Sequence, residues 1–337
     1  MSRMTAVRFV VLAAALVALA SATADAQGVS VTIDEWSVPT PNSHPHDPAV
    51  APDGSAWYTG QRSNTLGRFD PKTSQFKEYP LPTPNSGPHG IVADKGGNIW
   101  YTGNRAAHIG KLDPKTGKVT EYKMPDPRAR DPHTLIIDQQ GIIWFTVQGG
   151  GFIGRLDPAT GEVRLKERPG NPYGIIVNSK GVPFFDIFRT NKIGSIDPGT
   201  MEITEYTLPD PGARPRRIEV TSDDIIWYTD YARGKLGRLD PTTGKVDEFA
   251  SPGGPQSQPY GIARTPDDVL WYNESGVQPN TIVRFDPKTK AMQSWPIPSG
   301  GGVVRHMVSA PDGTLWLACS GVDKIGRVRV SPKTSDQ

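Results

Sequence analysis

The chain has 337 residues, and its 37 Lys and Arg nearly balance its 35 Asp and Glu, leaving a formal net charge of +2. Charges of both signs are spread evenly, which argues against a nucleic-acid partner, and the single cysteine excludes an internal disulfide. With 36 Gly, 33 Pro and 36% hydrophobic residues, the composition favours an all-β protein of short strands joined by many turns.

Residues 1–26 have the organisation of a secretory signal peptide. The first nine residues carry two positive charges, Arg3 and Arg8, and the apolar run VVLAAALVALA follows them. The small residues ADA, which end at Ala26, then form a candidate cleavage site. The apolar run is too short for a stable membrane span, and no comparable run follows it. We therefore expect residues 27–337 to form a single exported domain, secreted or periplasmic, with no membrane span in the mature chain.

An internal repeat organises the rest of the chain. An aromatic residue follows an aliphatic or small one at intervals of about 40–45 residues, in stretches such as SAWYTG, NIWYTG and IIWFTV. We call these aromatic residues the rungs of the repeat; they are Trp57, Trp100, Trp144, Phe184, Trp227, Trp271 and Trp316. Ten residues after most rungs comes a glycine in a stretch such as IGKLDP, followed by a strand-like segment such as KVTEY.

Each repeat predicts four short strands separated by Asp/Gly/Pro turns, which is the period of a β-propeller blade. Seven rungs predict seven blades. The C-terminal repeat stops after its third strand, KIGRVRV, whereas the segment after residue 28, VSVTIDEW, matches a fourth strand. The N-terminal strand should therefore complete the last blade and close the ring, which leaves no open sheet edge. We expect the tryptophans to pack between blades.

One position of the repeat collects most of the residues with potential chemistry. Eleven residues before each rung stand His46, His89, His133, Tyr173, Arg216, Tyr260 and Arg305. This position enters the first strand of each blade, so the seven side chains should surround one mouth of the central channel. The second strands end at the same mouth, where Asp230 and Glu274 supply carboxylates.

The three histidines come from consecutive blades, which suggests a shared site. Neutral imidazoles suit Zn, Cu or Fe, so His46, His89 and His133 are candidate ligands of a divalent metal. His44 and Asp47 flank the cluster and could add a ligand. The alternative is that each histidine only hydrogen-bonds the backbone of a neighbouring blade or faces solvent.

The other candidates also leave two roles open. Arg216 and Arg217, together with Arg305, could hold a substrate anion or form ion pairs between blades, for example with Asp230 or Glu219. Glu274 could act as a general acid or base beside Tyr260, or it could pair with Arg305. Tyr173 and Asp230 are candidate ligand-binding residues. We expect His108 at the surface, Cys319 in the core, and the repeated Asp-Pro aspartates in turns.

The stretch PHGIVADKGGNIWYTGNRAAHIGKLDPKTGKVTEYKMP resembles the repeat of the streptogramin B lyase (virginiamycin B lyase) family, and the resemblance extends from about residue 29 to 330. It implies a seven-bladed propeller that linearises cyclic depsipeptide antibiotics, and so confers resistance, by eliminating across an ester C–O bond with Mg²⁺. The family places a catalytic histidine where this chain has Tyr260. Its second histidine would correspond to His306, one place out of register, and its two acids to Val304 and Ser320.

Two functions follow as hypotheses. The first is a lyase-like enzyme that acts on a small ester, lactone or cyclic peptide at the histidine-rich mouth. His306, Glu274, Tyr260, Arg216 and Arg305 would be its catalytic residues, with Mg²⁺ by resemblance or Zn, Fe or Cu if the histidines ligate. The second is a non-catalytic propeller that binds a small ligand or a protein on the same face. A closed propeller requires no partner subunit, so we expect a monomer.

Overall fold

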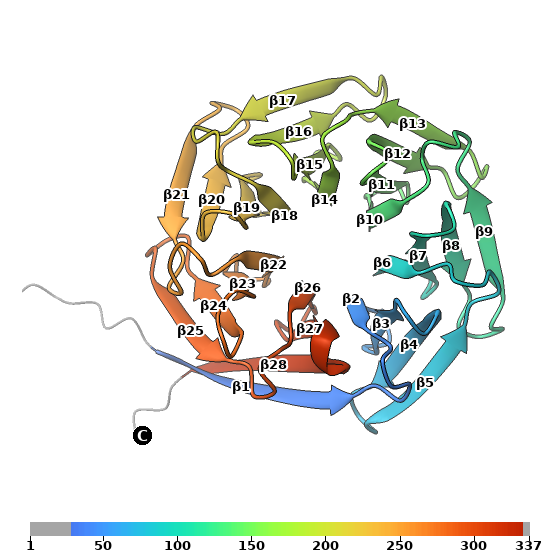
Figure 1. Ribbon diagram of the computed structural model, residues 1–337, viewed down its shortest axis with the longest axis horizontal. Helices are drawn as coiled ribbons and strands as arrows, with labels where there is room; N and C mark the ends of the chain where they lie inside the picture. The colour runs from blue at the N-terminus through green and yellow to red at the C-terminus, as the bar shows by residue number, and fades with distance from the viewer. Residues whose placement is uncertain (1–27, 333–337) are drawn as a thin grey trace, which may run out of the picture. The chain divides into compact units, whose positions relative to one another are not determined.

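The computed structural model describes residues 28–332, and residues 31–330 form one compact unit. Within it, seven four-stranded antiparallel sheets are arranged in a ring (Figure 1), which confirms the predicted seven-bladed all-β propeller. The signal peptide expected over residues 1–26 lies outside the described residues. No helix in the described part of the chain is long and apolar enough to cross a membrane.

The first strand of each blade lines the channel and the fourth lies at the rim. The innermost strands are β2 (Pro45–Val50), β6 (Pro88–Ala93), β10 (Pro132–Ile137), β14 (Pro172–Val177), β18 (Pro215–Val220), β22 (Pro259–Arg264) and β26 (Val304–Ser309). The second strands are β3 (Ala56–Gly60), β7 (Ile99–Gly103), β11 (Ile143–Val147), β15 (Pro183–Ile187), β19 (Ile226–Asp230), β23 (Leu270–Glu274) and β27 (Leu315–Cys319). The third strands are β4 (Thr65–Asp70), β8 (His108–Leu112), β12 (Phe152–Leu156), β16 (Lys192–Ile196), β20 (Lys235–Leu239), β24 (Thr281–Phe285) and β28 (Lys324–Pro332).

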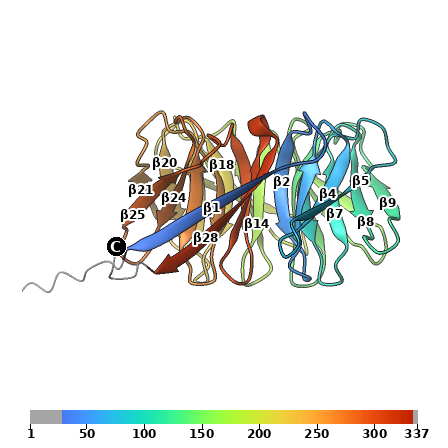
Figure 2. The same cartoon turned by 90° about the horizontal axis from the view of Figure 1, so that it is seen from below.

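The outermost strands include the one that closes the ring. They are β5 (Gln75–Pro80), β9 (Val119–Lys123), β13 (Val163–Glu167), β17 (Ile203–Thr207), β21 (Val246–Ala250), β25 (Met292–Pro296) and β1 (Val29–Ser37). The last sheet has the order β1-β28-β27-β26, so the N-terminal strand completes the seventh blade as predicted. Figure 2 shows β1 running beside β28 along the outside. A short 3-10 helix (Ser320–Val322) follows β27.

The hydrophobic core consists of separate layers, each between two adjacent blades. One layer joins Trp57 and Leu66 of the first blade to Ile99 and Tyr101 of the second. Another joins Trp316 of the seventh blade to Tyr58 and other residues of the first. The tryptophans therefore pack between blades, as expected, and every blade depends on its two neighbours to bury its faces.

In five of the seven blades a glycine of the third strand is needed because the aromatic residue after the rung lies across it. Tyr101 is the cross-strand partner of Gly110, and a Cβ on that glycine would overlap the Tyr101 ring. The same pairing joins Tyr58 to Gly67 and Tyr228 to Gly237. These blades thus pair a large ring with a residue that leaves space for it, whereas the sixth blade pairs Tyr272 with Val283.

A bulge in every inner strand determines which side chains enter the channel. In the first blade Pro45 pairs with Gly60 and Pro48 with Tyr58, so His46 and Asp47 together face the single residue Thr59. The Thr59 hydroxyl accepts a hydrogen bond from the Asp47 N–H (3.1 Å) and donates one to the His89 carbonyl of the next blade (2.8 Å). A bulge of this kind directs two successive side chains toward the same side.

Candidate functional site

The three histidines predicted at the mouth are in contact with one another. The ring centroids of His46 and His89 are 3.6 Å apart, and those of His89 and His133 are 3.8 Å apart, with the planes of each pair tilted by 42°. The His133 ring in turn contacts Tyr173, with the centroids 4.1 Å apart. All three histidines are buried, with 2–4% of their surface exposed. The bulge brings them together because it places the same position of three consecutive blades on the channel side.

The other half of the mouth is a tyrosine–arginine cluster. The Tyr173 and Tyr260 hydroxyls form a short hydrogen bond, and both side chains are buried. The Arg216 guanidinium lies 3.8 Å from the Tyr260 ring centroid and 4.1 Å from that of Tyr231, and Phe188 lies beside it at 4.9 Å. Such stacking stabilises an arginine without neutralising its charge.

The positive charges at the mouth favour the ionised form of Tyr260. Burial alone raises the pKa of the Tyr260 hydroxyl, but the charges of Arg216, Arg217 and Arg305 and the hydrogen bond from Tyr173 outweigh it, so the pKa lies below its usual value. For Tyr173, burial and its neighbour Tyr260 raise the pKa. Within the pair, Tyr260 is therefore the hydroxyl that gives up its proton first.

A hydrogen-bonded belt crosses the channel directly beneath the histidines. The Arg217 guanidinium donates to Asp47 Oδ1 (2.8 Å) and to Thr134 Oγ1 (3.1 Å), which connects the fifth blade to the first and third. Asp47 Oδ1 is also 2.8 Å from His46 Nδ1, and Thr134 Oγ1 is 2.9 Å from His133 Nδ1. The belt thus fixes the rings above it.

The histidines are neutral in this environment. Burial lowers the pKa of His46 to about 4, against the opposing effect of Asp47. Burial, the neighbouring histidines and Arg217 hold the pKa values of His89 and His133 well below the usual range. Neutral imidazole is the form that binds a metal.

The geometry groups an aspartate with two of the predicted metal ligands. One potential ligand atom each from His46, Asp47 and His89 lies within 4.8 Å of the others. Nδ1 of His89 is buried and has no hydrogen-bond partner among the described residues. His133 contacts His89 but does not belong to this close group, and its Nδ1 is hydrogen-bonded to Thr134. Two nitrogen donors and one oxygen suit Zn, Fe or Cu and not Mg²⁺, which prefers oxygen.

The two carboxylates predicted at the mouth, Glu274 and Asp230, form hydrogen bonds and ion pairs with groups outside the histidine and tyrosine–arginine clusters. Glu274 accepts hydrogen bonds from Ser251 Oγ (2.5 Å), the Gly253 N–H (2.6 Å) and Thr281 Oγ1 (2.6 Å), and so it holds a loop. Asp230 accepts from the Arg214 N–H (3.0 Å) and pairs with Arg233 (3.2 Å). Neither carboxylate contacts a side chain of the histidine or tyrosine cluster.

Two other histidines, His306 and His108, lie outside the cluster of His46, His89 and His133. His306 lies at the level of Asp47 and Arg217 and lines a cavity deeper in the channel, with Nδ1 unpartnered among residues 28–332. The expectation that His108 lies at the surface is wrong, since it is 2% exposed and packs edge-on against Tyr101. Cys319 is buried, as expected.

Arg216 and Arg305 are the charged groups available to a ligand. Both side chains are half-buried, and neither forms an ion pair with a carboxylate in the described part of the chain. Arg217 does form an ion pair between blades, but with Asp47 and not with Asp230 or Glu219. The Nε atoms of both are also without a hydrogen-bond partner there. The mouth therefore carries unpaired positive charge above a closed aromatic layer.

Sequence reasoning missed the belt, although a signal for it was present. The position after the predicted mouth residue is glycine in three blades (Gly90, Gly174 and Gly261) and polar in the other four (Asp47, Thr134, Arg217 and His306). A strictly alternating strand would turn this position away from the channel. The bulge instead keeps it inside.

These features define a class: a seven-bladed propeller whose channel mouth is filled by closely packed histidine, tyrosine and arginine side chains. The family model described as the virginiamycin B lyase family matches residues 23–175 and 158–336. The chain therefore belongs to the virginiamycin B lyase family. The search of curated proteins found no match.

Solved structures agree with this assignment. A streptogramin B lyase structure is 29% identical, with a TM-score of 0.82, and the match covers 89% of this chain and 98% of that one. A catalytically inactive histidine variant of virginiamycin B lyase from Staphylococcus aureus, with quinupristin, is 27% identical, with a TM-score of 0.80 over 89% and 99% of the two chains. The extracellular domain of a hybrid two component system from B. thetaiotaomicron, 16% identical, shares the fold alone (TM-score 0.66; 87% and 40% covered).

Proposed function

We propose that the channel mouth binds a small ester or lactone, such as a cyclic depsipeptide, and opens it by eliminating across a C–O bond. The observation that carries this proposal is the buried Tyr260 hydroxyl, which is bonded to Tyr173 and lies under the Arg216 charge. A tyrosine with a lowered pKa can accept a proton, which is the role that the resemblance gives to a histidine at this position.

The reaction balances without water. Tyr260, as the phenolate, takes the proton from the carbon next to the carbon that bears the ester oxygen. The electron pair of that C–H bond forms a C=C bond, the C–O bond breaks, and the ester oxygen leaves as a carboxylate. Tyr173 holds the Tyr260 oxygen in place by its hydrogen bond.

Arg216 and Arg305 would stabilise the negative charge that develops on the leaving carboxylate. An unpaired guanidinium beside the reacting bond stabilises this charge more in the transition state than in the ester, which is the condition for a rate effect. We do not assign Glu274 or Asp230 a part in catalysis or binding, because loop and arginine contacts occupy their oxygens.

The close group of His46, Asp47 and His89 could hold a divalent metal of the Zn, Fe or Cu type. Such an ion, when bound, would polarise a carbonyl oxygen of the ligand. The Mg²⁺ implied by the resemblance does not fit these nitrogen donors, because Mg²⁺ prefers oxygen ligands. His133 would support the His89 ring by packing against it.

A non-catalytic binding role is the second candidate, favoured by the burial of Tyr260, which is 1% exposed. A ligand would meet Arg216 and Arg305 first and would reach Tyr260 only if the Arg216 side chain moved. In either role we propose a small-molecule partner for an exported monomer, with the leader over residues 1–26.

One assay separates these roles. Purified protein is incubated with quinupristin and with simple lactones, and the products are read by mass spectrometry. Elimination leaves the mass of the opened ring unchanged, whereas hydrolysis adds the mass of water. Tyr260→Phe should lower turnover about 10²–10⁴-fold, because it removes only the proton-accepting oxygen. The remote Tyr122→Phe serves as the control.

Binding without turnover, lost in Arg216→Met, would favour the second candidate. No binding of any ester or lactone would refute both. Metal content measured after Zn²⁺ supplementation should fall in a His46→Ala/His89→Ala variant, and wild-type protein that carries no ion would remove the metal from the proposal.

A further inference from the structure

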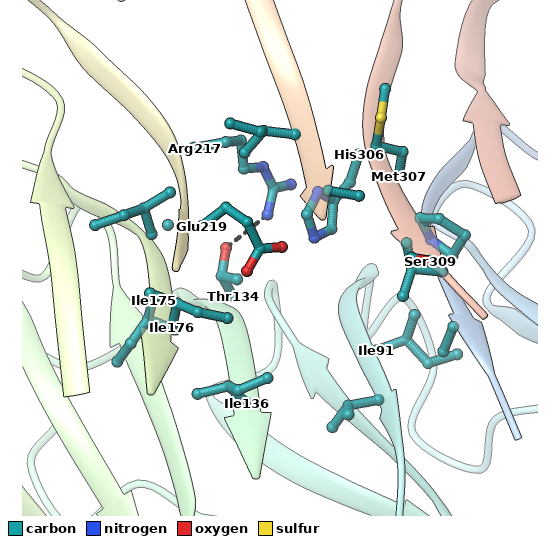
Figure 3. Close-up of a pocket in the computed structure, with 18 of the residues that line it drawn as sticks. Ile91, Thr134, Ile136, Ile175, Ile176, Arg217, Glu219, His306, Met307 and Ser309 are labelled. Carbon is teal, nitrogen blue, oxygen red and sulfur yellow. Dashed lines mark hydrogen bonds between the residues drawn. The ribbon is translucent and has the colours of Figure 1, made fainter. Parts of the chain in front are cut away.

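A second compartment lies in the channel beyond the belt of Asp47, Arg217 and Thr134. It is a cavity of about 230 Å³, and Arg217, Thr134 and His306 form part of its wall (Figure 3). The other wall residues follow these positions along the inner strands, toward the end of the channel away from the histidine mouth. Several of them are half-exposed, so solvent reaches the cavity from that side.

Most residues that line this cavity are aliphatic, although polar atoms form nearly half of the exposed lining. Ile91, Ile136, Ile175 and Ile176 come from three successive blades and form one side of the wall. The polar side chains on the wall are Thr134, Arg217, Glu219, Arg264, His306 and Ser309. A cavity with this lining can take an apolar chain that carries one polar head.

Two of the charged groups on the wall are already neutralised. Arg217 is paired with Asp47 at 2.8 Å, and Arg264 is paired with Asp268 at 2.7 Å. Burial and the charge of Arg217 lower the pKa of His306 to about 3, so this histidine is neutral. None of the three contributes unmatched charge to the cavity.

Glu219 is the charged group that remains. Its side chain points into the cavity (Figure 3), and it forms no ion pair within residues 28–332. Its Oε1 accepts a hydrogen bond from the neighbouring Val220 N–H at 2.9 Å. Burial raises the pKa of Glu219 to about 7, although the Val220 N–H and the charge of Arg264 act in the opposite direction. A cation placed beside this carboxylate would relieve the cost of its burial.

We propose that this cavity is a binding site for a small aliphatic ammonium ion, with the ammonium on Glu219 and the chain against the isoleucines. The carboxylate without an ion-pair partner indicates that the ligand's head group is positively charged, and the aliphatic part of the wall indicates that its tail is apolar. The volume allows a chain of a few carbons, since an apolar cavity of about 150 Å³ already accommodates benzene. The site is separate from the mouth and does not depend on its function.

Isothermal titration with three ligands of equal chain length tests the charge preference. At pH 8, n-hexylammonium should bind, hexanol should bind more weakly, and hexanoate should not bind. n-Butylammonium should bind more weakly than n-hexylammonium, by up to about fourfold per methylene removed, if the chain lies on the aliphatic wall. Lowering the pH to 6 should reduce the affinity for hexylammonium about tenfold, because Glu219 becomes protonated below about pH 7.

Variants then assign the binding to Glu219. Glu219→Gln should reduce the affinity for hexylammonium at least tenfold. Ser309→Ala on the same wall and Arg216→Met at the mouth should leave this affinity unchanged. If Glu219→Gln does not fold, a carbon-13 titration of the Glu219 carboxyl in wild-type protein replaces it, and hexylammonium should lower its pKa. Equal binding of hexanoate, unchanged binding in Glu219→Gln, or no binding at millimolar hexylammonium would overturn the proposal.

Discussion

Asp186 occupies a position that carries a threonine hydroxyl in four other blades. Thr59, Thr102, Thr146 and Thr229 each donate to a carbonyl of the next blade and accept from an N–H of their own inner strand. Asp186 accepts from the Gly174 N–H at 3.2 Å, and its side chain is fully buried. Burial raises the pKa of its carboxyl well above the usual value, so the folded protein holds this proton at pH values at which an exposed aspartate has already lost it.

We predict that Asp186→Asn stabilises the protein at high pH. Because the folded pKa is raised, the unfolded chain releases a proton above about pH 4 that the folded chain retains, and stability falls as pH rises. Asparagine removes this cost, so the unfolding midpoint at pH 8 should increase by roughly 2 °C or more for each kcal/mol recovered. The gain should shrink toward pH 4.

Calorimetry at several pH values checks the sign. Asp197→Asn is the control, because turn N–H groups hydrogen-bonded to that exposed carboxylate lower its pKa, and its loss should not stabilise the protein at pH 8. A gain from Asp186→Asn that is the same at every pH would contradict the account, because it would not come from ionisation.

At the scale of the strand, the pairing of a glycine with an aromatic ring is the rule of the repeat. Five blades place a tyrosine or phenylalanine opposite this glycine. The seventh blade pairs Gly326 with Leu317 instead, and a Cβ there would lie 3.3 Å from Leu317 Cδ1, within reach of a small adjustment. The two kinds of blade therefore offer a matched comparison.

We predict that Gly110→Ala destabilises the fold by about 1–3 kcal/mol or more, because the added methyl displaces the Tyr101 ring from a packed layer. Gly326→Ala should cost clearly less. Urea unfolding of both variants measures the difference. If both substitutions lower the free energy of unfolding by the same amount, the loss would come from the backbone flexibility of glycine and not from a clash with the Tyr101 ring.

The repeat shows how far sequence reasoning reaches in this fold. Spacing predicted the seven blades, the closing strand and the position shared by His46, His89 and His133, because each of these depends on local pattern alone. The bulge was missed because strand alternation places the residue after the mouth position outside the channel, and the glycine or polar residue found there in every blade was not used as a signal. The inward orientation of Asp47 and Arg217 was missed with it. Glu274 was placed on the correct strand end, but the loop that binds its oxygens comes from a different part of the chain.

At the scale of the whole molecule, the ion pair of Asp47 and Arg217 connects opposite sides of the ring. The two side chains are 1–2% exposed and belong to the first and fifth blades. Thr134 adds a contact to the third blade. The belt therefore ties together blades that share no hydrophobic layer.

We predict strong coupling within this pair. Asp47→Asn or Arg217→Met alone should each cost about 3–5 kcal/mol, because each leaves a buried charge without its partner. The double variant should cost much less than the sum, and a double-mutant cycle by urea unfolding measures the difference. Additive effects would mean that the two groups do not depend on each other, contrary to the 2.8 Å contact.

The seventh sheet has a consequence for the order in which the molecule is assembled. Its strands β1 and β28 stand at opposite ends of the folded chain, so their pairing closes a loop that contains every other blade. The entropy cost of closure grows with the length of that loop, which makes this pairing the last to form and the first to be lost. During synthesis the first six blades can stack one by one as they emerge, but the channel, its belt and its histidine mouth become complete only when the final strand arrives.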